Sequence, residues 1–137
     1  MRAKRFVDAN VLVYAVEVRG AETTKCSKAR QILQSEQVCF STQVLGEFYQ
    51  AVTSPRRLSL THNEAVAWIQ LWKRYGVDGI SLPHVDLALE LAEHFRINYY
   101  DALIIAAARL AECPIVYSED LNDGQDYGGV RVRNPFR

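Results

Sequence analysis

The sequence of 137 residues predicts an α/β protein in which helices cover a small parallel sheet. Short apolar runs of strand type alternate with longer runs of helical period, and this alternation is typical of parallel strands joined by helices. The length fits one domain spanning residues 1–137, and no Pro-, Ser- or Gly-rich stretch marks an internal boundary. We therefore expect one compact unit.

The first half of the chain contains two predicted strand-to-helix units. Arg5–Asp8 is predicted to be a strand that leads into a helix at Val11–Val16. Val38–Ser41 is predicted to be a second strand, followed by a helix at Gln43–Val52. Both units change from strand to helix at a polar residue, where open parallel sheets bind their ligands.

The second half begins with a well-marked helix. Thr61–Glu64 has the form of a capping box, and the apolar stripe behind it is predicted to end at Gly76. The remaining predicted elements are a strand at Ile80–Leu82, helices at Val85–Phe95 and Tyr100–Leu110, a buried strand at Ile115–Ser118 and a short edge strand at Val130–Val132.

Composition and charge limit which classes of function the sequence can support. Sixteen Lys and Arg residues balance sixteen Asp and Glu residues, so no strong overall field attracts nucleic acid or membrane, and any polyanion must be held locally. The three cysteines are far apart and form no Cys-x-x-Cys, which argues against a disulfide framework or a zinc site. No segment has the form of a signal peptide or a membrane span, so we expect a cytoplasmic protein without a membrane partner.

Four acids, Asp8, Glu47, Asp101 and Asp120, are the strongest functional signal in the chain. Carboxylates drawn toward a core are neutralised or partnered, and a metal ion is the natural partner for several together. Asp8 and Asp120 each follow an apolar run and therefore lie at the carboxyl ends of predicted strands. Taken alone, Asp8 can be a helix cap and Asp120 a turn acid.

The other two acids lie on predicted helices. Glu47 falls on the margin of an apolar helix face, where an inward and a solvated position are both open. Asp101 begins a helix that is apolar nearly all round, so it should enter a core or a cleft. The alternative for Asp101 is an acid favoured in the first turn by the helix dipole. The joint placement of all four acids favours a shared site.

Four segments resemble the successive acidic motifs of the PIN domain family, and most of all those of VapC-type toxins from bacterial and archaeal toxin–antitoxin pairs. They are Phe6–Leu12, Gln43–Phe48, Tyr99–Ile104 and Val116–Leu121. The resemblance implies a PIN-like three-layer α/β/α fold and an endoribonuclease that depends on Mg²⁺ or Mn²⁺. One departure is Ala9, which stands where the family often has Thr or Ser and removes a hydroxyl near the metal.

The resemblance also implies a catalytic metal pocket formed by the four acids. Asp8 and Asp101 are expected as primary ligands, and Glu47 and Asp120 as water-mediated ligands or orienting groups. Oxygen ligands suit hard ions such as Mg²⁺ and Mn²⁺. The expected supporting residues are Asn10, Thr42 and Ser118 as a polar wall, with Glu119 and Asp123 as alternatives to Asp120.

An RNA substrate would need local contacts because the chain has no net charge. Arg56 and Arg57, just after the helix that carries Glu47, are the predicted phosphate contacts. Exposed tyrosines can also stack unpaired bases, although core packing explains most tyrosines. The resemblance further implies a cognate antitoxin protein as partner and a homodimer.

Three other interpretations remain open on the sequence. A Mg²⁺-dependent phosphatase would also use strand-end aspartates, but its usual second Asp is replaced by Asn10. A PIN-like binding module without catalysis is disfavoured by the presence of all four acids. A PIN nuclease that processes RNA and is not a toxin differs only in its genomic partner.

Overall fold

The computed structural model describes residues 4–17 and 23–137. The elements in chain order are β1 (Arg5–Val7), α1 (Ala9–Val16), α2 (Thr23–Ser35), β2 (Val38–Ser41), α3 (Thr42–Thr53), α4 (His62–Trp72), β3 (Gly76–Asp78), α5 (Leu82–Phe95), α6 (Tyr99–Leu110), β4 (Ile115–Tyr117) and β5 (Arg131–Arg133). The predicted α/β class is therefore confirmed.

The strands form one parallel sheet in the order β3-β2-β1-β4-β5. All four residues of β2 are buried, as expected for a strand covered on both faces. From β1 the chain first builds β2 and β3 on one side and later β4 and β5 on the other. The crevice between the ends of β1 and β4 is thus a topological switch point, where open α/β sheets bind ligands.

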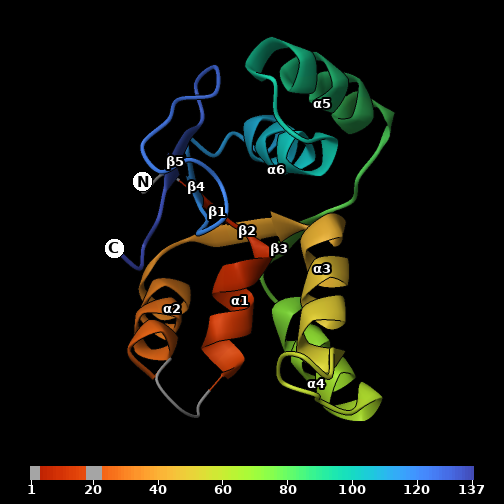
Figure 1. The fold of residues 1–137 in the computed structure, drawn as a ribbon, viewed down its shortest axis with the longest axis vertical. Coiled ribbons are helices and arrows are strands. Elements are labelled where there is room, and N and C mark those ends of the chain that lie inside the picture. Colours follow the sequence, from red (N-terminus) through yellow and green to blue (C-terminus); the bar gives the residue numbers. More distant parts are fainter. Residues whose placement is uncertain (1–3, 18–22) are drawn as a thin grey trace.

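Helices cover both faces of the sheet in three layers (Figure 1). α5 and α6 lie on one face, and α1, α2, α3 and α4 lie on the other. Residues 102–108 of α6 are all buried, because this helix packs against both the sheet and α5. The three-layer α/β/α arrangement expected from the resemblance is confirmed.

The region after α4 differs from the sequence prediction. The helix ends at Trp72, before Gly76, and Gly76 begins the edge strand β3 that the sequence did not predict. A Cβ at Gly76 would lie 3.3 Å from Cβ of Cys39 on β2, so the close pairing of the two strands favours glycine. β3 is short and partly exposed, and its residues therefore carry no apolar pattern.

The strand predicted at Ile80–Leu82 is wrong, because Leu82 is the first residue of α5. The backbone N–H of Ser81 donates to Nδ1 of His84 at 3.2 Å, which caps the helix start. A proline in the first turn also favours a helix beginning here, since its missing N–H would have no partner in that turn.

Helix α2 was not predicted. Its buried residues Cys26, Ala29, Ile32 and Leu33 recur at helical spacing, but the polar residues between them dilute the apolar pattern. No helix within the described ranges combines the length and the apolar character needed to cross a membrane.

Candidate active site

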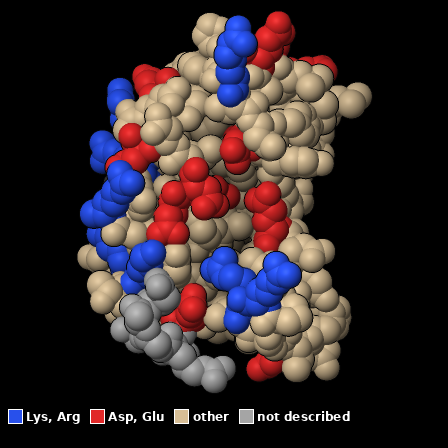
Figure 2. Space-filling view, in the orientation of Figure 1, with Lys and Arg blue, Asp and Glu red and all other residues tan. Residues whose placement is uncertain are grey.

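The four predicted acids line one pocket of about 770 Å³. Figure 2 shows acidic side chains gathered in a hollow near the middle of the molecule, with basic side chains beside it. Asp8 follows β1 and Asp120 follows β4, whereas Glu47 lies on α3 and Asp101 in the first turn of α6. The fold therefore brings together four acids from segments far apart in the sequence.

Asp8 is buried at the switch point between β1 and β4, with only 6% of its surface exposed. Its Oδ1 accepts a hydrogen bond from the backbone N–H of Ala9 at 2.7 Å, and its Oδ2 accepts one from Oγ of Ser118 at 2.7 Å. Asp8 therefore caps α1 and lines the pocket at the same time. The hydroxyl that contacts Asp8 comes from Ser118.

Asn10 links Ser118, the hydrogen-bond partner of Asp8, to Asp120. Its Nδ2 donates to Oδ2 of Asp120 at 3.2 Å and to Oγ of Ser118 at 3.4 Å. The backbone N–H of Asp120 donates to the same Ser118 oxygen at 3.1 Å. We call Asp8, Asn10 and Asp120, together with the fully buried Ser118 behind them, the strand-end side of the pocket; Ser118 itself does not line the pocket.

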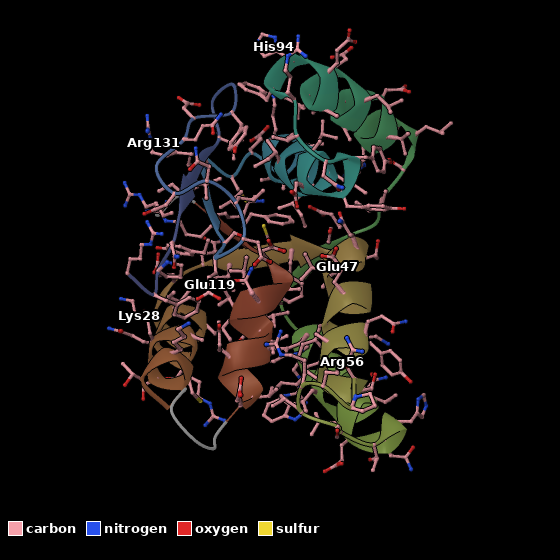
Figure 3. All side chains as sticks on the ribbon, in the orientation of Figure 1. Lys28, Glu47, Arg56, His94, Glu119 and Arg131 are labelled. Carbon is pink, nitrogen blue, oxygen red and sulfur yellow. The ribbon has the colours of Figure 1, made fainter. Side chains whose placement is uncertain are left out.

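The opposite wall, which we call the helix side, consists of Gln43, Glu47, Tyr100 and Asp101. Nε2 of Gln43 donates to Oε2 of Glu47 at 3.3 Å and to the backbone oxygen of Tyr100 at 3.1 Å, and so links α3 to α6. Figure 3 places Glu47 toward the end of α3 that lies near the sheet. Asp8 is the only buried acid of the four, since Asp101 is partly buried and Glu47 and Asp120 are exposed in the pocket wall.

The acids raise one another's pKa in the absence of a cation. Burial, followed by the charges of Glu47 and Asp120, raises the pKa of Asp8 to about 7, against the lowering effect of its two hydrogen bonds. Desolvation in the pocket raises the pKa of Glu47 even though its side chain is exposed overall, and the charges of Asp101 and Asp120 add to this. Desolvation and Asp120 raise the pKa of Asp101. A cation in the pocket would relieve this repulsion.

The donor set fits a hard divalent ion that keeps much of its water. Every acidic group at the pocket offers oxygen, the ligand that Mg²⁺ and Mn²⁺ prefer. Within residues 4–17 and 23–137, no group of three or more His, Cys, Asp or Glu is arranged to hold an ion directly. Mg²⁺ is commonly bound by one or two carboxylates and several waters, which this open arrangement allows.

Glu119 does not point into the pocket. Its carboxylate accepts hydrogen bonds from the Tyr14 hydroxyl at 2.7 Å and from Nζ of Lys25 at 2.8 Å. These contacts lower the pKa of Glu119 against the opposing effect of burial. Figure 3 shows Glu119 on the side of α1 that faces α2. Glu119 is thus committed to a contact with α1 and α2, and Asp120 is its neighbour that lines the pocket.

Asp123 and Thr42 also have other partners. Asp123 accepts from the backbone N–H of Asn134 at 2.8 Å and pairs with Arg137 at 3.8 Å. Oγ1 of Thr42 accepts from the backbone N–H of Ile80 at 3.1 Å. Neither residue lines the pocket, in contrast to Asn10.

Of the two predicted phosphate contacts, Arg57 lines the pocket and Arg56 does not. Both follow α3 in a turn in which the N–H of Arg57 donates to the Ser54 oxygen at 3.0 Å. Gln43 also lines the pocket, although it was not among the predicted site residues. Its spacing of four residues before Glu47, which places both on one helix face, is the signal that could have found it.

The fold and the pocket define an α/β protein with a cluster of acids at the switch point of its sheet. The sequence matches the PIN domain family over residues 5–122, and the chain belongs to this family. No curated protein matches the sequence.

Several solved structures share the fold. VapC20 of Mycobacterium tuberculosis, described as a sarcin–ricin loop cleaving toxin, is 24% identical with a TM-score of 0.66 over 95% of this chain and 99% of its own. A toxin–antitoxin complex from Klebsiella pneumoniae is 17% identical with a TM-score of 0.70, over 96% and 97%. DNA-bound VapBC from Salmonella typhimurium is 18% identical with a TM-score of 0.68, over 98% and 99%.

Proposed function

We propose that this protein is an endoribonuclease that hydrolyses phosphodiester bonds in RNA with Mg²⁺ or Mn²⁺, acting as one nuclease domain over residues 1–137. The observation that carries the proposal is the convergence of Asp8, Glu47, Asp101 and Asp120 on one pocket, where three of them have raised pKa values. Such perturbed groups in a cleft are typical of catalytic sites.

In this proposal Asp8 and Asp101 are the main metal-binding carboxylates, and Glu47 and Asp120 support them. When bound, the ion polarises a phosphodiester oxygen and activates water at neutral pH. Asp8 is held in one orientation by Ser118 and the N–H of Ala9, which limits its rotation. Oε2 of Glu47 is engaged by Gln43, which leaves Oε1 to accept a proton or a hydrogen bond from the attacking water.

The RNA backbone is proposed to bind along α3. The pocket lining follows this helix from Gln43 through Glu47 and Gln50 to Ser54, and ends at Arg57. At 1.5 Å per residue, Glu47 and Ser54 are roughly 10 Å apart along the helix axis. Arg57 can therefore hold a phosphate near the one that is cleaved, and a guanidinium suits this role because its donors match phosphate geometry.

The similar structures support a toxin as the biological role. They include VapC20 and two toxin–antitoxin assemblies that share the fold over nearly the whole chain. We propose that this chain is the toxin of such a pair, with a cognate antitoxin protein as its inhibitor, a homodimer as its working form and the cytoplasm as its compartment. Coexpression with the product of a neighbouring small gene should then restore growth that the wild-type chain alone arrests.

The central test is cleavage of purified total RNA with Mg²⁺ or Mn²⁺. Wild-type protein should cut RNA only when the ion is present, and Asp8→Asn and Asp101→Asn should each reduce the rate by at least roughly 100-fold, because a ligand matters no less than its supporting partners. Asp86→Asn, which changes an exposed acid on α5, is the matched control and should cut at the wild-type rate.

Cleavage that persists both in chelator and in Asp8→Asn would contradict the proposal. Hydrolysis of a small phosphate ester without RNA cleavage would instead support the phosphatase interpretation. Mapping the cut ends on the RNA would identify the target.

A further inference from the structure

Tyr100 combines two properties that no other described residue shares. It is the one aromatic side chain among the described residues that line the acidic pocket. It is also 62% exposed, although a large aromatic side chain is usually at least half-buried. The exposed leucines Leu82 and Leu89 lie on α5 and do not line this pocket, so ordinary surface exposure does not account for the position of Tyr100.

The position of Tyr100 is fixed by contacts on three sides. Its backbone N–H donates to Oδ1 of Asn98 at 2.8 Å, and its backbone oxygen accepts from Nε2 of Gln43 at 3.1 Å. Its ring meets the ring of Tyr99 edge to face, with centroids 5.2 Å apart and planes at 78°. The ring is therefore held in place while most of its surface stays available to a ligand.

Three further tyrosines, Tyr49, Tyr99 and Tyr127, have other contacts. The hydroxyl of Tyr49 lies 3.0 Å from Nδ1 of His62, and the two rings pack edge to face. Tyr127 is 2% exposed and belongs to the core, and Tyr99 is partly buried against it. Among these tyrosines, only Tyr100 both lines the pocket and is largely exposed.

The two ends of α3 place Tyr100 and Arg57 on opposite sides of the acids. Gln43, in the first turn of α3, contacts Tyr100, whereas Arg57 follows the end of the helix. From Gln43 to Ser54 the helix rises roughly 16 Å, and Glu47 lies between them. Figure 3 shows Glu47 near one end of α3 and Arg56 near the other. A ligand along this wall would meet an aromatic ring, then carboxylates, then a guanidinium.

We propose that Tyr100 is a stacking platform for an unpaired base beside the cleaved phosphate, and that this contact supplies part of the affinity for RNA. This inference rests on the proposed nuclease function. In an A-form duplex the bases are stacked on each other, whereas bases of a single strand can turn out and stack on aromatic side chains. Stacking on an aromatic ring tolerates every base, because each has a π face. Tyr100 therefore adds affinity for an unpaired base without selecting its identity.

Cleavage kinetics of three Tyr100 forms test the platform. On an unstructured RNA oligonucleotide, Tyr100→Phe keeps the ring and should retain the wild-type KM, whereas Tyr100→Leu should raise KM about tenfold, within the range measured for loss of a stacked base. Leu89→Ala, which removes an exposed apolar side chain outside the pocket, is the matched control. The same RNA annealed to its complement should be cut by the wild type at least roughly tenfold less efficiently.

A second readout does not depend on cleavage. RNA with 2-aminopurine beside the cut position, mixed with protein in chelator, should lose fluorescence on binding to wild type and Tyr100→Phe but not to Tyr100→Leu. If the wild type cuts RNA but Tyr100→Leu keeps its KM, or if the duplex is cut equally well, the platform is overturned while the nuclease stands. If no RNA is cut but the 2-aminopurine signal depends on Tyr100, the nuclease proposal fails and the binding platform is supported.

Discussion

The two sides of the pocket are built in different ways. On the strand-end side, Asp8 and Ser118 are buried and joined by a hydrogen bond across the ends of β1 and β4. On the helix side, Glu47 and Tyr100 are exposed, and their link is the amide of Gln43. That amide still has a buried oxygen, Oε1, without a hydrogen-bond donor in the described part of the chain. The first side is preorganised, and the second is open to solvent and ligand.

This difference separates two roles within one site. A buried carboxylate in a fixed orientation can bind a metal ion without reorganisation, but keeping it charged in a metal-free protein is costly. Exposed polar groups on helices carry a smaller desolvation penalty, and they can contact a substrate. We infer that the strand-end side, together with Asp101, serves the ion and that the rest of the helix side mainly serves the RNA, so substitutions in the two groups should give different signatures.

The largest predicted effect is the pH dependence of metal-free stability, caused by Asp8. Its pKa in the folded protein is about 7, above its ordinary value of 3.8, so the folded state binds this proton more tightly than the unfolded state. Stability should therefore fall as pH rises from about 4 to about 7, and remain low above that range. The difference between this pKa and its ordinary value corresponds to about 4 kcal/mol in the free energy of unfolding. Urea unfolding in chelator at several pH values measures it.

Asp8→Asn should flatten this pH dependence and make the metal-free protein more stable than wild type at pH 8, despite its loss of activity. Asp86→Asn, at an exposed position on α5, should leave the curve unchanged. Adding Mn²⁺ at pH 8 should raise the melting temperature of wild type. At pH 6, below the pKa of Asp8, its binding should also release protons, because the ion binds the charged form. A wild-type stability that rises between pH 4 and pH 7 would contradict the burial of Asp8.

The second prediction compares two buried serines at the ends of β2 and β4, the strands on either side of β1. Oγ of Ser118 donates to Asp8 and accepts from the N–H of Asp120, so Ser118→Ala leaves a buried carboxylate with one donor fewer. This should lower the free energy of unfolding by about 1–3 kcal/mol and slow RNA cleavage by about 10–100-fold.

Ser41 at the end of β2 is the matched control. It is equally buried, but its hydroxyl has no hydrogen-bond partner in the described part of the chain. Ser41→Ala removes an unsatisfied group and should leave stability equal to or above that of wild type. Urea unfolding and cleavage rates measure both variants. If the two variants lose stability and activity equally, the cavity left by the serine hydroxyl, and not the lost hydrogen bond to Asp8, causes the effect.

The strand-end side was also the part of the fold that the sequence predicted best. The apolar runs before Asp8 and Asp120 have the strand period, and a parallel sheet brings such strand ends to one edge. What the sequence did not show is which acid near β4 faces the pocket. Glu119 turns away because Tyr14 and Lys25 bind it, and this contact depends on the packing of α2, a helix that was itself not predicted.

The helix side could be predicted only in part. A helical wheel placed Glu47 on a margin, and the structure places it in the wall of the pocket with an exposed side chain. The position of Tyr100 at this wall depends on where the sheet places the first turn of α6 relative to the first turn of α3, which no periodicity reports. The edge strand β3 was missed for the same reason, since its place is determined by pairing with β2 and not by its own apolar pattern.

The smallest predicted effect is that of Gln43→Met, which removes the link on the helix side while keeping side-chain volume. Two hydrogen bonds of this partly exposed amide are lost, but the unsatisfied Oε1 is removed as well. Because these contributions oppose each other, the free energy of unfolding should change by less than about 1 kcal/mol. RNA cleavage should slow less than in Ser118→Ala, since Glu47 and Tyr100 lose orientation but not their positions. Gln70→Met, at an exposed position on α4 outside the pocket, is the matched control. A loss of activity in Gln43→Met as large as that in Ser118→Ala would mean that the helix side is as preorganised as the strand-end side, and the division of roles between them would have to be abandoned.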